Sequence, residues 1–163
     1  MTKAVNEAVS ESILESTKAQ SLYEQDILLW IEDTVAKLKA GDFQNLDIIN
    51  LIEEVESLGI SQKKELLSRL NTLIQHLLKR IYVNLANDYN GWERTIRNQR
   101  IELEFLFKDA PSLKSKFIKS FDFAWTKALA ELRKEYPHVN FPDCWQYPHD
   151  LETILNRDFW EED

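Results

Sequence analysis

Hydrophobic residues recur every three or four positions along the chain, which is the spacing of amphipathic helices. The first such stretch predicts a helix from about Leu22 to Lys39, and Gly41 is placed to end it. The positions expected to face the core are Tyr23, Ile27, Trp30, Ile31, Thr34 and Leu38.

A second, shorter helix is predicted from about Asp47 to Leu58, with Gly59 as its stop. Four of its residues are expected to point inward: Leu51, Ile52, Val55 and Leu58. Ser61 is then expected to cap a long helix, because a serine side chain accepts hydrogen bonds from the free N–H groups of a first turn. One face of this helix carries the stripe Leu66, Leu70, Leu73, Ile74, Leu77, Ile81 and Leu85.

Two further helices are predicted after a turn at residues 88–91. The first runs from Trp92 to Lys108, and Asp109 with Pro111 marks the start of the next. The last long stripe consists of Leu113, Phe117, Phe121, Ala124, Trp125, Ala128 and Leu132. No segment alternates with a period of two, so we predict no sheet. The pattern predicts an all-α fold, an antiparallel four- to five-helix bundle joined by short links.

The two ends of the chain differ from this bundle, which we place at residues 21–136. Residues 1–20 are expected to be mobile or weakly helical. Residues 137–163 are rich in proline and aromatic residues and are expected to cover the bundle, with one short helix near residues 150–156. Four aromatic residues are predicted to anchor this segment in apolar grooves: Trp145, Tyr147, Phe159 and Trp160.

Composition disfavours several classes of protein. The 163 residues correspond to about one domain. Cys144 is the single cysteine, so no disulfide can form within the chain and a reducing compartment is expected. The longest apolar run is five residues, Ile27–Ile31, whereas a membrane span needs roughly 20. Residues 1–20 contain no signal-peptide core. We therefore predict a bacterial-type cytoplasmic protein without a membrane partner.

The charge is unevenly distributed. The net charge is −8, which disfavours a general nucleic-acid binder. Residues 61–100 nevertheless carry eight basic and three acidic side chains, whereas residues 22–56 carry nine acidic and two basic ones. The acidic part includes Glu53, Glu54 and Glu56, and carboxylates of this kind can bind a hard cation such as Mg²⁺. Because no second carboxylate motif follows, we expect a solvated or salt-bridged face and no metal.

Three polar residues on two helices are candidate site residues. His76 lies on a stripe with Arg69 and Arg80, which is either an anion site or a surface that packs beside the acidic helices. Gln99 falls on the apolar face of the helix from Trp92, and Arg100 falls at its edge. A buried polar group needs hydrogen bonds, so these two are expected to form a structural network or to line a polar pocket.

The expected partners of Arg100 are Glu54 and Asp26, which makes Asp26, Glu54, His76, Gln99 and Arg100 the candidate polar site. In the tail, His138, Cys144 and His149 are potential zinc ligands, but their spacings match no zinc signature. We assign no catalytic residue and expect no cofactor.

Several blocks of residues together resemble a known family. They include LIEEVESLG (residues 51–59), HLLK (76–79), the pattern WxxTIxxQR (92–100), FPDC (141–144) and DFW (158–160). Over residues 22–160 the chain resembles the bacterial domain of unknown function family number 29, which is abundant in cyanobacteria. Trp145 and Glu161 stand where the family usually has proline. The resemblance implies a small all-helical protein and supplies no reaction or cofactor.

These observations favour a non-enzymatic module that binds another protein or itself. The alternative is a small metal- or nucleotide-dependent hydrolase that uses Asp26, Glu54, His76 and Arg100 in a polar cleft between helices. Nucleic-acid binding through residues 61–100 requires that basic face to be exposed.

Overall fold

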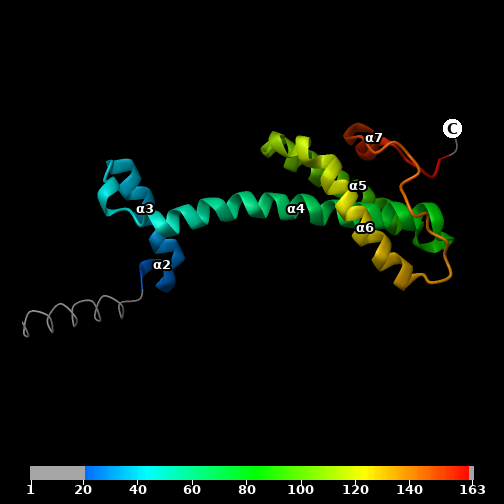
Figure 1. The fold of residues 1–163 in the computed structure, drawn as a ribbon, viewed down its shortest axis with the longest axis horizontal. Coiled ribbons are helices and arrows are strands. Elements are labelled where there is room, and N and C mark those ends of the chain that lie inside the picture. Colours follow the sequence, from blue (N-terminus) through cyan, green and yellow to red (C-terminus); the bar gives the residue numbers. More distant parts are fainter. Residues whose placement is uncertain (1–20, 162–163) are drawn as a thin grey trace, which may run out of the picture. The chain divides into compact units, whose positions relative to one another are not determined.

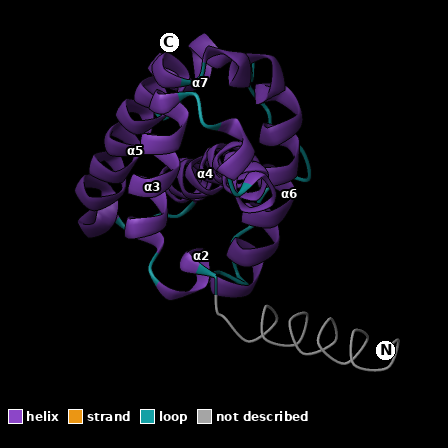
Figure 2. Ribbon diagram, turned by 90° about the vertical axis from the view of Figure 1, so that its left-hand side faces the viewer, coloured by secondary structure: helices purple, strands orange, loops and turns teal. Residues whose placement is uncertain are grey.

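The computed structural model describes residues 21–161 of the chain. Over these residues the protein is all-α and contains no strand (Figures 1 and 2), which confirms the predicted fold class. None of the helices described combines the length and apolar character needed to cross a membrane. The predicted extension, residues 1–20, lies outside the described residues.

Two compact units divide the chain, one up to Glu56 and one from Ser57. Helix α4 (Ile48–Tyr82) begins in the first unit and continues into the second. The first unit also contains α2 (Leu22–Gln25), α3 (Ile27–Ala40) and the 3-10 turn η1 (Phe43–Asn45). The second unit contains η2 (Ala86–Asp88), α5 (Tyr89–Asp109), η3 (Pro111–Lys116), α6 (Phe117–Glu135) and α7 (Leu151–Asn156).

Asp26 divides the first predicted helix into two. Its backbone is extended, and its side chain accepts hydrogen bonds from the N–H groups of Leu28 and Leu29 at 3.0 and 3.1 Å. Asp26 thus ends α2 and caps α3, as an aspartate at an N-cap does. At the other end, Gly41 has a φ of 72°, a left-handed conformation that favours glycine, so the predicted stop at Gly41 is confirmed.

The predicted break between two helices at Gly59 is wrong, because α4 continues through both Gly59 and Ser61 (Figure 1). Gly41 is the one described glycine with a positive φ, so Gly59 has no C-cap geometry. An interior glycine costs a helix only about 1 kcal/mol relative to alanine. The neighbouring glutamates, lysines and leucines favour helix, and no proline interrupts them.

In the second unit, α4 runs between α5 and α6 (Figure 2). Arg69 and Arg80 of α4 pair with Glu102 and Glu93 of α5, respectively, so these two helices run in opposite directions. Lys79 bonds to Glu135 of α6 at 3.0 Å, and four residues earlier Gln75 donates to Glu131. Helix α6 therefore runs in the direction of α4, which gives the up-down-up order of an antiparallel bundle.

The hydrophobic core lies among these helices and includes most of the predicted leucine stripe. Leu66, Leu70, Leu73, Ile74 and Leu77 are buried, while Ile81 is only partly buried. Leu85 follows the end of α4 and is exposed. The stripe of α6 is buried from Phe117 to Leu132 as predicted, and Leu113 of η3 joins it.

The expectation for α3 and the start of α4 is wrong at several positions that were expected to face a core. Ile52, Val55 and Leu58 of α4 are exposed, and so are Ile27, Ile31 and Leu38 of α3. Trp30 and Thr34 are buried as predicted. The helical spacing of these residues is correct, but their side chains are exposed rather than buried.

The C-terminal segment covers the second unit as predicted. Its short helix α7 begins after Asp150, whose side chain accepts a hydrogen bond from the N–H of Thr153 at 2.9 Å. Phe159 is buried in the core, and the other predicted anchors pack against the core: Trp145, Tyr147 and Trp160. Trp145 contacts four aromatic rings, those of Phe121, Trp125, Tyr147 and Phe159.

Candidate functional site

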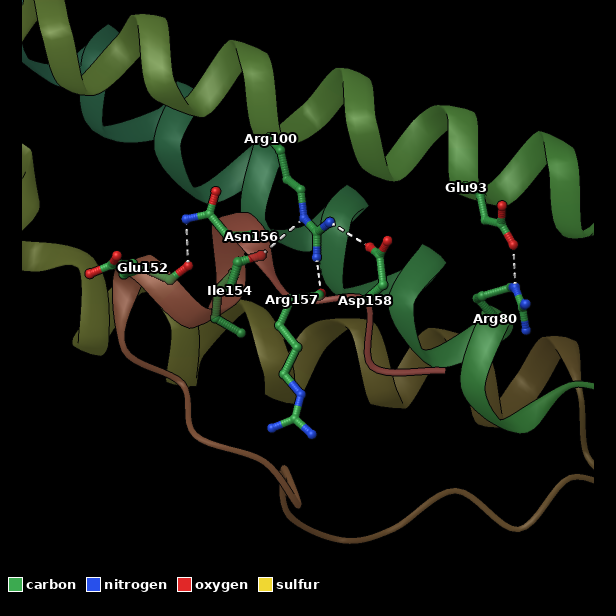
Figure 3. Close-up of polar contacts among 8 residues, drawn as sticks. All are labelled: Arg80, Glu93, Arg100, Glu152, Ile154, Asn156, Arg157 and Asp158. Carbon is green, nitrogen blue, oxygen red and sulfur yellow. Dashed lines mark hydrogen bonds and ion pairs between the residues drawn. The ribbon is translucent and has the colours of Figure 1, made fainter. Parts of the chain in front are cut away.

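Arg100 is the one buried charged side chain among residues 21–161, with 8% of its surface exposed. It projects from α5 toward the C-terminal segment (Figure 3). Its Nε donates to the carbonyl of Ile154 at 3.1 Å, and Nη2 donates to the carbonyl of Arg157. Nη1 pairs with the Asp158 carboxylate at 2.9 Å.

These bonds satisfy backbone carbonyl groups at the C-terminal end of a helix. The last carbonyls of an α-helix have no partner within the helix and carry partial negative charge, which a cation stabilises. Ile154 and Arg157 lie at the C-terminal end of α7, so Arg100 binds the atoms that this helix leaves open. Asp158 supplies the opposite charge. The carboxylate partner of Arg100 is therefore Asp158, and the expectation of Asp26 and Glu54 as its partners is corrected.

The other basic residues of the stripe on α4 are also paired, but with α5 rather than with the acidic helices. Arg69 lies 3.0 Å from both Glu65 and Glu102. The Nε of Arg80 lies 2.6 Å from Glu93 (Figure 3), which belongs to α5. The stripe was expected to pack beside the acidic helices, but Arg69 and Arg80 pair with glutamates of α5 instead.

Arg80 also stacks on aromatic rings. Its guanidinium lies 4.0 Å from the ring centre of Tyr89 and 5.0 Å from that of Trp160. Trp160 thus adds a second contact between a basic residue of the bundle and the C-terminal segment. A guanidinium that already has a carboxylate and two rings around it is a structural group rather than an open anion site.

A hollow of about 390 Å³ lies beside Arg100, between α5 and the C-terminal segment. Two arginines and four carboxylates line it: Arg97, Arg100, Glu93, Glu104, Asp158 and Glu161. The lining therefore has an excess of negative charge, and each of the three nitrogens of the Arg100 guanidinium already donates one hydrogen bond. This arrangement gives an incoming anion little to bind.

His76 and Gln99 do not join Arg100 in one cluster. The Nδ1 of His76 lies 2.9 Å from the carbonyl of Thr72, one turn earlier in α4. Burial lowers the pKa of His76, and the neighbouring Lys79 lowers it further, against the opposing effect of the hydrogen bond to Thr72. Gln99 lies on α5, where its side chain is partly exposed.

The other two candidate residues, Asp26 and Glu54, hold the first unit together. Glu54 accepts a 2.6 Å hydrogen bond from the hydroxyl of Tyr23, and this bond is the main reason why the pKa of Tyr23 rises to about 12. The ring of Tyr23 packs edge-on against Trp30 at 5.0 Å. Trp30 in turn donates from its indole N–H to Asp47 at 3.1 Å.

Asp47 binds the start of α4 as well. One carboxylate oxygen of Asp47 accepts from the backbone N–H of Asn50 at 3.3 Å, and the other accepts from the Asn50 side chain at 2.7 Å. The hydrogen bonds of Asn50, followed by that of Trp30, hold the pKa of Asp47 below its usual range, against the opposing effect of burial. The bonds of Asp47 join α3 to the start of α4, and the bond between Tyr23 and Glu54 joins α2 to α4.

No group of three or more His, Cys, Asp or Glu side chains in the described part of the chain is arranged to hold a metal ion. Of the possible zinc ligands in the tail, Cys144 is exposed and accepts a weak hydrogen bond from Gln146. His149 stacks on the ring of Phe121.

The first unit exposes many of its large apolar side chains. Twelve large hydrophobic residues of residues 21–56 are exposed, whereas the much longer stretch 57–161 has seven. We call these twelve the open apolar surface: Leu22, Ile27, Leu28, Leu29, Ile31, Val35, Leu38, Phe43, Ile48, Ile49, Ile52 and Val55. Among residues 21–56, only Trp30 and Thr34 are buried.

A second surface, in the other unit, joins lysines to an apolar floor. Two hollows of about 560 and 270 Å³ adjoin between α4 and α6, because Leu67 and Phe123 line both. We call them together the lysine groove, after the five lysines along it: Lys63, Lys64, Lys116, Lys119 and Lys127.

The residues that the sequence analysis missed had partial signals. Lys116, Lys119, Phe123 and Lys127 recur at spacings of three and four, which places them along one face of η3 and α6. The buried apolar stripe of the same helix was the stronger pattern. Nothing in the sequence links Asp158 to Arg100, because that contact depends on the path of the tail.

The family comparison agrees with the residues that carried the resemblance. The sequence profile described as "Domain of unknown function DUF29" matches residues 22–160, which is nearly the whole chain. Neither the curated proteins nor the solved structures give a significant match. The chain belongs to the DUF29 family.

Proposed function

We propose that this protein is a non-enzymatic protein-interaction module and that the open apolar surface is where its partner binds. The observation that carries the proposal is the concentration of exposed large hydrophobic residues in residues 21–56. A monomeric soluble protein rarely exposes a contiguous apolar patch of more than a few hundred Å², and larger patches mark interaction sites.

The small core of the first unit supports this proposal. A helix with an apolar face must bury that face against another element to gain stability. Here α3 and the start of α4 have only Trp30 and Thr34 as buried side chains. Polar bonds such as those of Tyr23 and Asp47 position the helices, but they bury little apolar area.

The charge of the same unit indicates the chemistry of the partner. Residues 22–56 contain nine acidic and two basic residues. Acidic residues around an apolar surface favour a partner that presents basic residues around an apolar surface, and such complementarity raises the association rate at low salt. We therefore expect a protein partner with a basic, apolar face.

Photo-crosslinking tests this proposal. Benzoylphenylalanine is introduced at Leu28 or Ile52, which are 69% and 53% exposed, in cells that produce the protein naturally. Phe105 of α5, which is 57% exposed, is the matched control position. We expect one discrete protein adduct from Leu28 and Ile52, identified by peptide mapping and lost in an Ile49→Asp background.

The absence of an adduct at both test positions would contradict the proposal. Adducts that also form from Phe105, or that persist in the Ile49→Asp background, would contradict it as well, because they would reflect nonspecific contact.

A further inference from the structure

We infer that the partner is a second copy of this chain, and that the open apolar surface of one copy binds the lysine groove of the other. This inference rests on the proposed function and names its partner. It follows from the composition of the groove, the charge of the open apolar surface and the exclusion of the alternative pairing between two identical surfaces.

The groove carries positive charge that the chain itself leaves uncompensated. All five of its lysines are exposed, and none forms an ion pair with a carboxylate in residues 21–161. Glu131 is the one acidic residue of the lining, and it accepts a hydrogen bond from Gln75. By contrast, several basic residues of the same unit have carboxylate partners, among them Arg69, Lys79, Arg80 and Arg100.

The floor of the groove is suited to an apolar segment. Phe123 is half exposed, and Leu67 beside it is only partly buried. The ammonium group of Lys127 lies 5.2 Å from the centre of the Phe123 ring. A lysine stem can extend an apolar floor while its charged end stays in water, so the groove combines apolar contact with positive charge.

Asn71 adds a hydrogen-bond acceptor that lacks a donor. It lines the smaller hollow, and its side-chain oxygen is buried without a hydrogen-bond partner in the described structure. Buried polar atoms nearly always have a partner. An N–H or O–H group from a segment in the groove would supply it.

The open apolar surface has the complementary properties. It lies on helices with nine acidic and two basic residues, and several of these acids are exposed without a bond to the rest of the unit, among them Glu32, Glu53 and Glu56. Pairing of two open apolar surfaces with each other would bring two such acidic units together, and like charges oppose this. Pairing with the lysine groove brings opposite charges together.

The contact joins two different surfaces, so it is heterologous. Two copies can exchange it reciprocally and form a closed dimer, or successive copies can form a chain. In both cases, every contact pairs the open apolar surface of one copy with the lysine groove of another. This property permits a complementation test with two variants of the full-length protein.

In the groove variant, Lys63→Glu, Lys116→Glu and Lys119→Glu reverse the charge of the groove. In the acidic-surface variant, Glu32→Lys, Glu53→Lys and Glu56→Lys reverse the charge around the open apolar surface. A control, Arg94→Glu, Arg97→Glu and Lys108→Glu, makes on α5 the same change of net charge as the groove variant makes on the groove. All nine side chains are exposed, and circular dichroism of each variant checks its fold.

Sedimentation velocity at low salt gives the readout. We expect the wild-type chain and the control to associate, and each of the two test variants to associate about 100-fold more weakly, because like charges then face each other. An equimolar mixture of the two test variants should form a complex again, since one carries an intact acidic surface and the other an intact groove.

A wild-type chain that stays monomeric at all concentrations would overturn the inference, and so would a groove variant that associates as the wild type does. A mixture that forms no complex would also overturn it. Crosslinking from Ile52 to another protein, with a monomeric wild-type chain, would refute only the inference and leave the proposed function in place.

If a variant fails to fold, carbodiimide crosslinking of the wild-type protein tests whether the open apolar surface of one copy contacts the lysine groove of another. Light and ¹⁵N-labelled chains are mixed, and the reagent joins carboxylates to lysines that are in contact. Heavy–light peptide pairs between residues 47–56 and the groove lysines support the inference. Their absence overturns it.

Discussion

The guanidinium of Arg100 and the carboxylate of Asp158 lie 2.9 Å apart, although 58 residues separate them in the sequence. Together with the bonds from Arg100 to two carbonyls of the same segment, this pair joins α5 to the C-terminal end of α7. Through this contact, the packing of the C-terminal segment contributes to the stability of the bundle.

Arg100→Ala is expected to destabilise the protein by about 2–4 kcal/mol, because it leaves two carbonyls and a carboxylate without their donor. Asp158→Asn should cost about 1 kcal/mol or less, since Asp158 is partly exposed. Urea unfolding measures both, with the exposed Arg97→Ala as the control. A loss for Arg100→Ala no larger than that for Arg97→Ala would contradict this role.

The stability of the protein is expected to fall as the pH drops from 7.5 to 5.5, in part because of His76. Its pKa in the folded protein is below the ordinary value, mainly through burial. The unfolded chain therefore binds a proton first, and the contribution of His76 is fully present above about pH 6.5 and is lost below it. Urea unfolding at both pH values should give a smaller decrease for His76→Gln, whereas the exposed His138→Gln should behave as the wild type. Equal decreases in all three proteins would rule out this effect.

Glu54→Gln is expected to lower the pKa of Tyr23 from about 12 toward the ordinary value of 10, because the hydrogen bond to the Glu54 carboxylate is the main cause of the shift. Titration of the tyrosine Cζ carbons by NMR measures this change. Tyr136 is an internal control, since burial is the main cause that raises its pKa. A Tyr23 signal that titrates identically in both proteins would show that Glu54 is not its partner.

Two glycine substitutions test the continuity of α4. Gly59→Ala should stabilise the protein by about 0.5–1 kcal/mol, since alanine is the better helix former and a Cβ at this position meets no atom within 4 Å. Gly41→Ala should instead destabilise it by about 1 kcal/mol, because the φ of 72° is unfavourable for alanine. Thermal unfolding measures both, and destabilisation by Gly59→Ala would indicate a helix end at Gly59.

Much of the fold could be predicted from the sequence because helical spacing is a local property. The helix α5, the apolar stripe of α6, the stop at Gly41 and the short helix α7 all follow from neighbouring residues. The predicted helix end at Gly59 was wrong. A glycine at a helix end typically adopts a positive φ, and Gly59 does not. The helix-forming residues around Gly59 keep α4 continuous.

The candidate site was harder to predict, because it depends on long-range contacts. Spacing correctly identified Arg100 as a buried polar group that needs partners, but the partners lie in the tail, whose path the sequence does not reveal. For Ile52 and Val55 the apolar pattern indicated burial, although a pattern cannot show whether the chain itself or a second molecule covers a face.

Photo-crosslinking from Ile52 shows whether the open apolar surface binds a protein. If the open apolar surface is a binding site, benzoylphenylalanine at this position forms one discrete protein adduct, and Ile49→Asp abolishes it, while the control at Phe105 forms none. A chain that forms no adduct from Ile52 or Leu28 in its native cells would contradict the account.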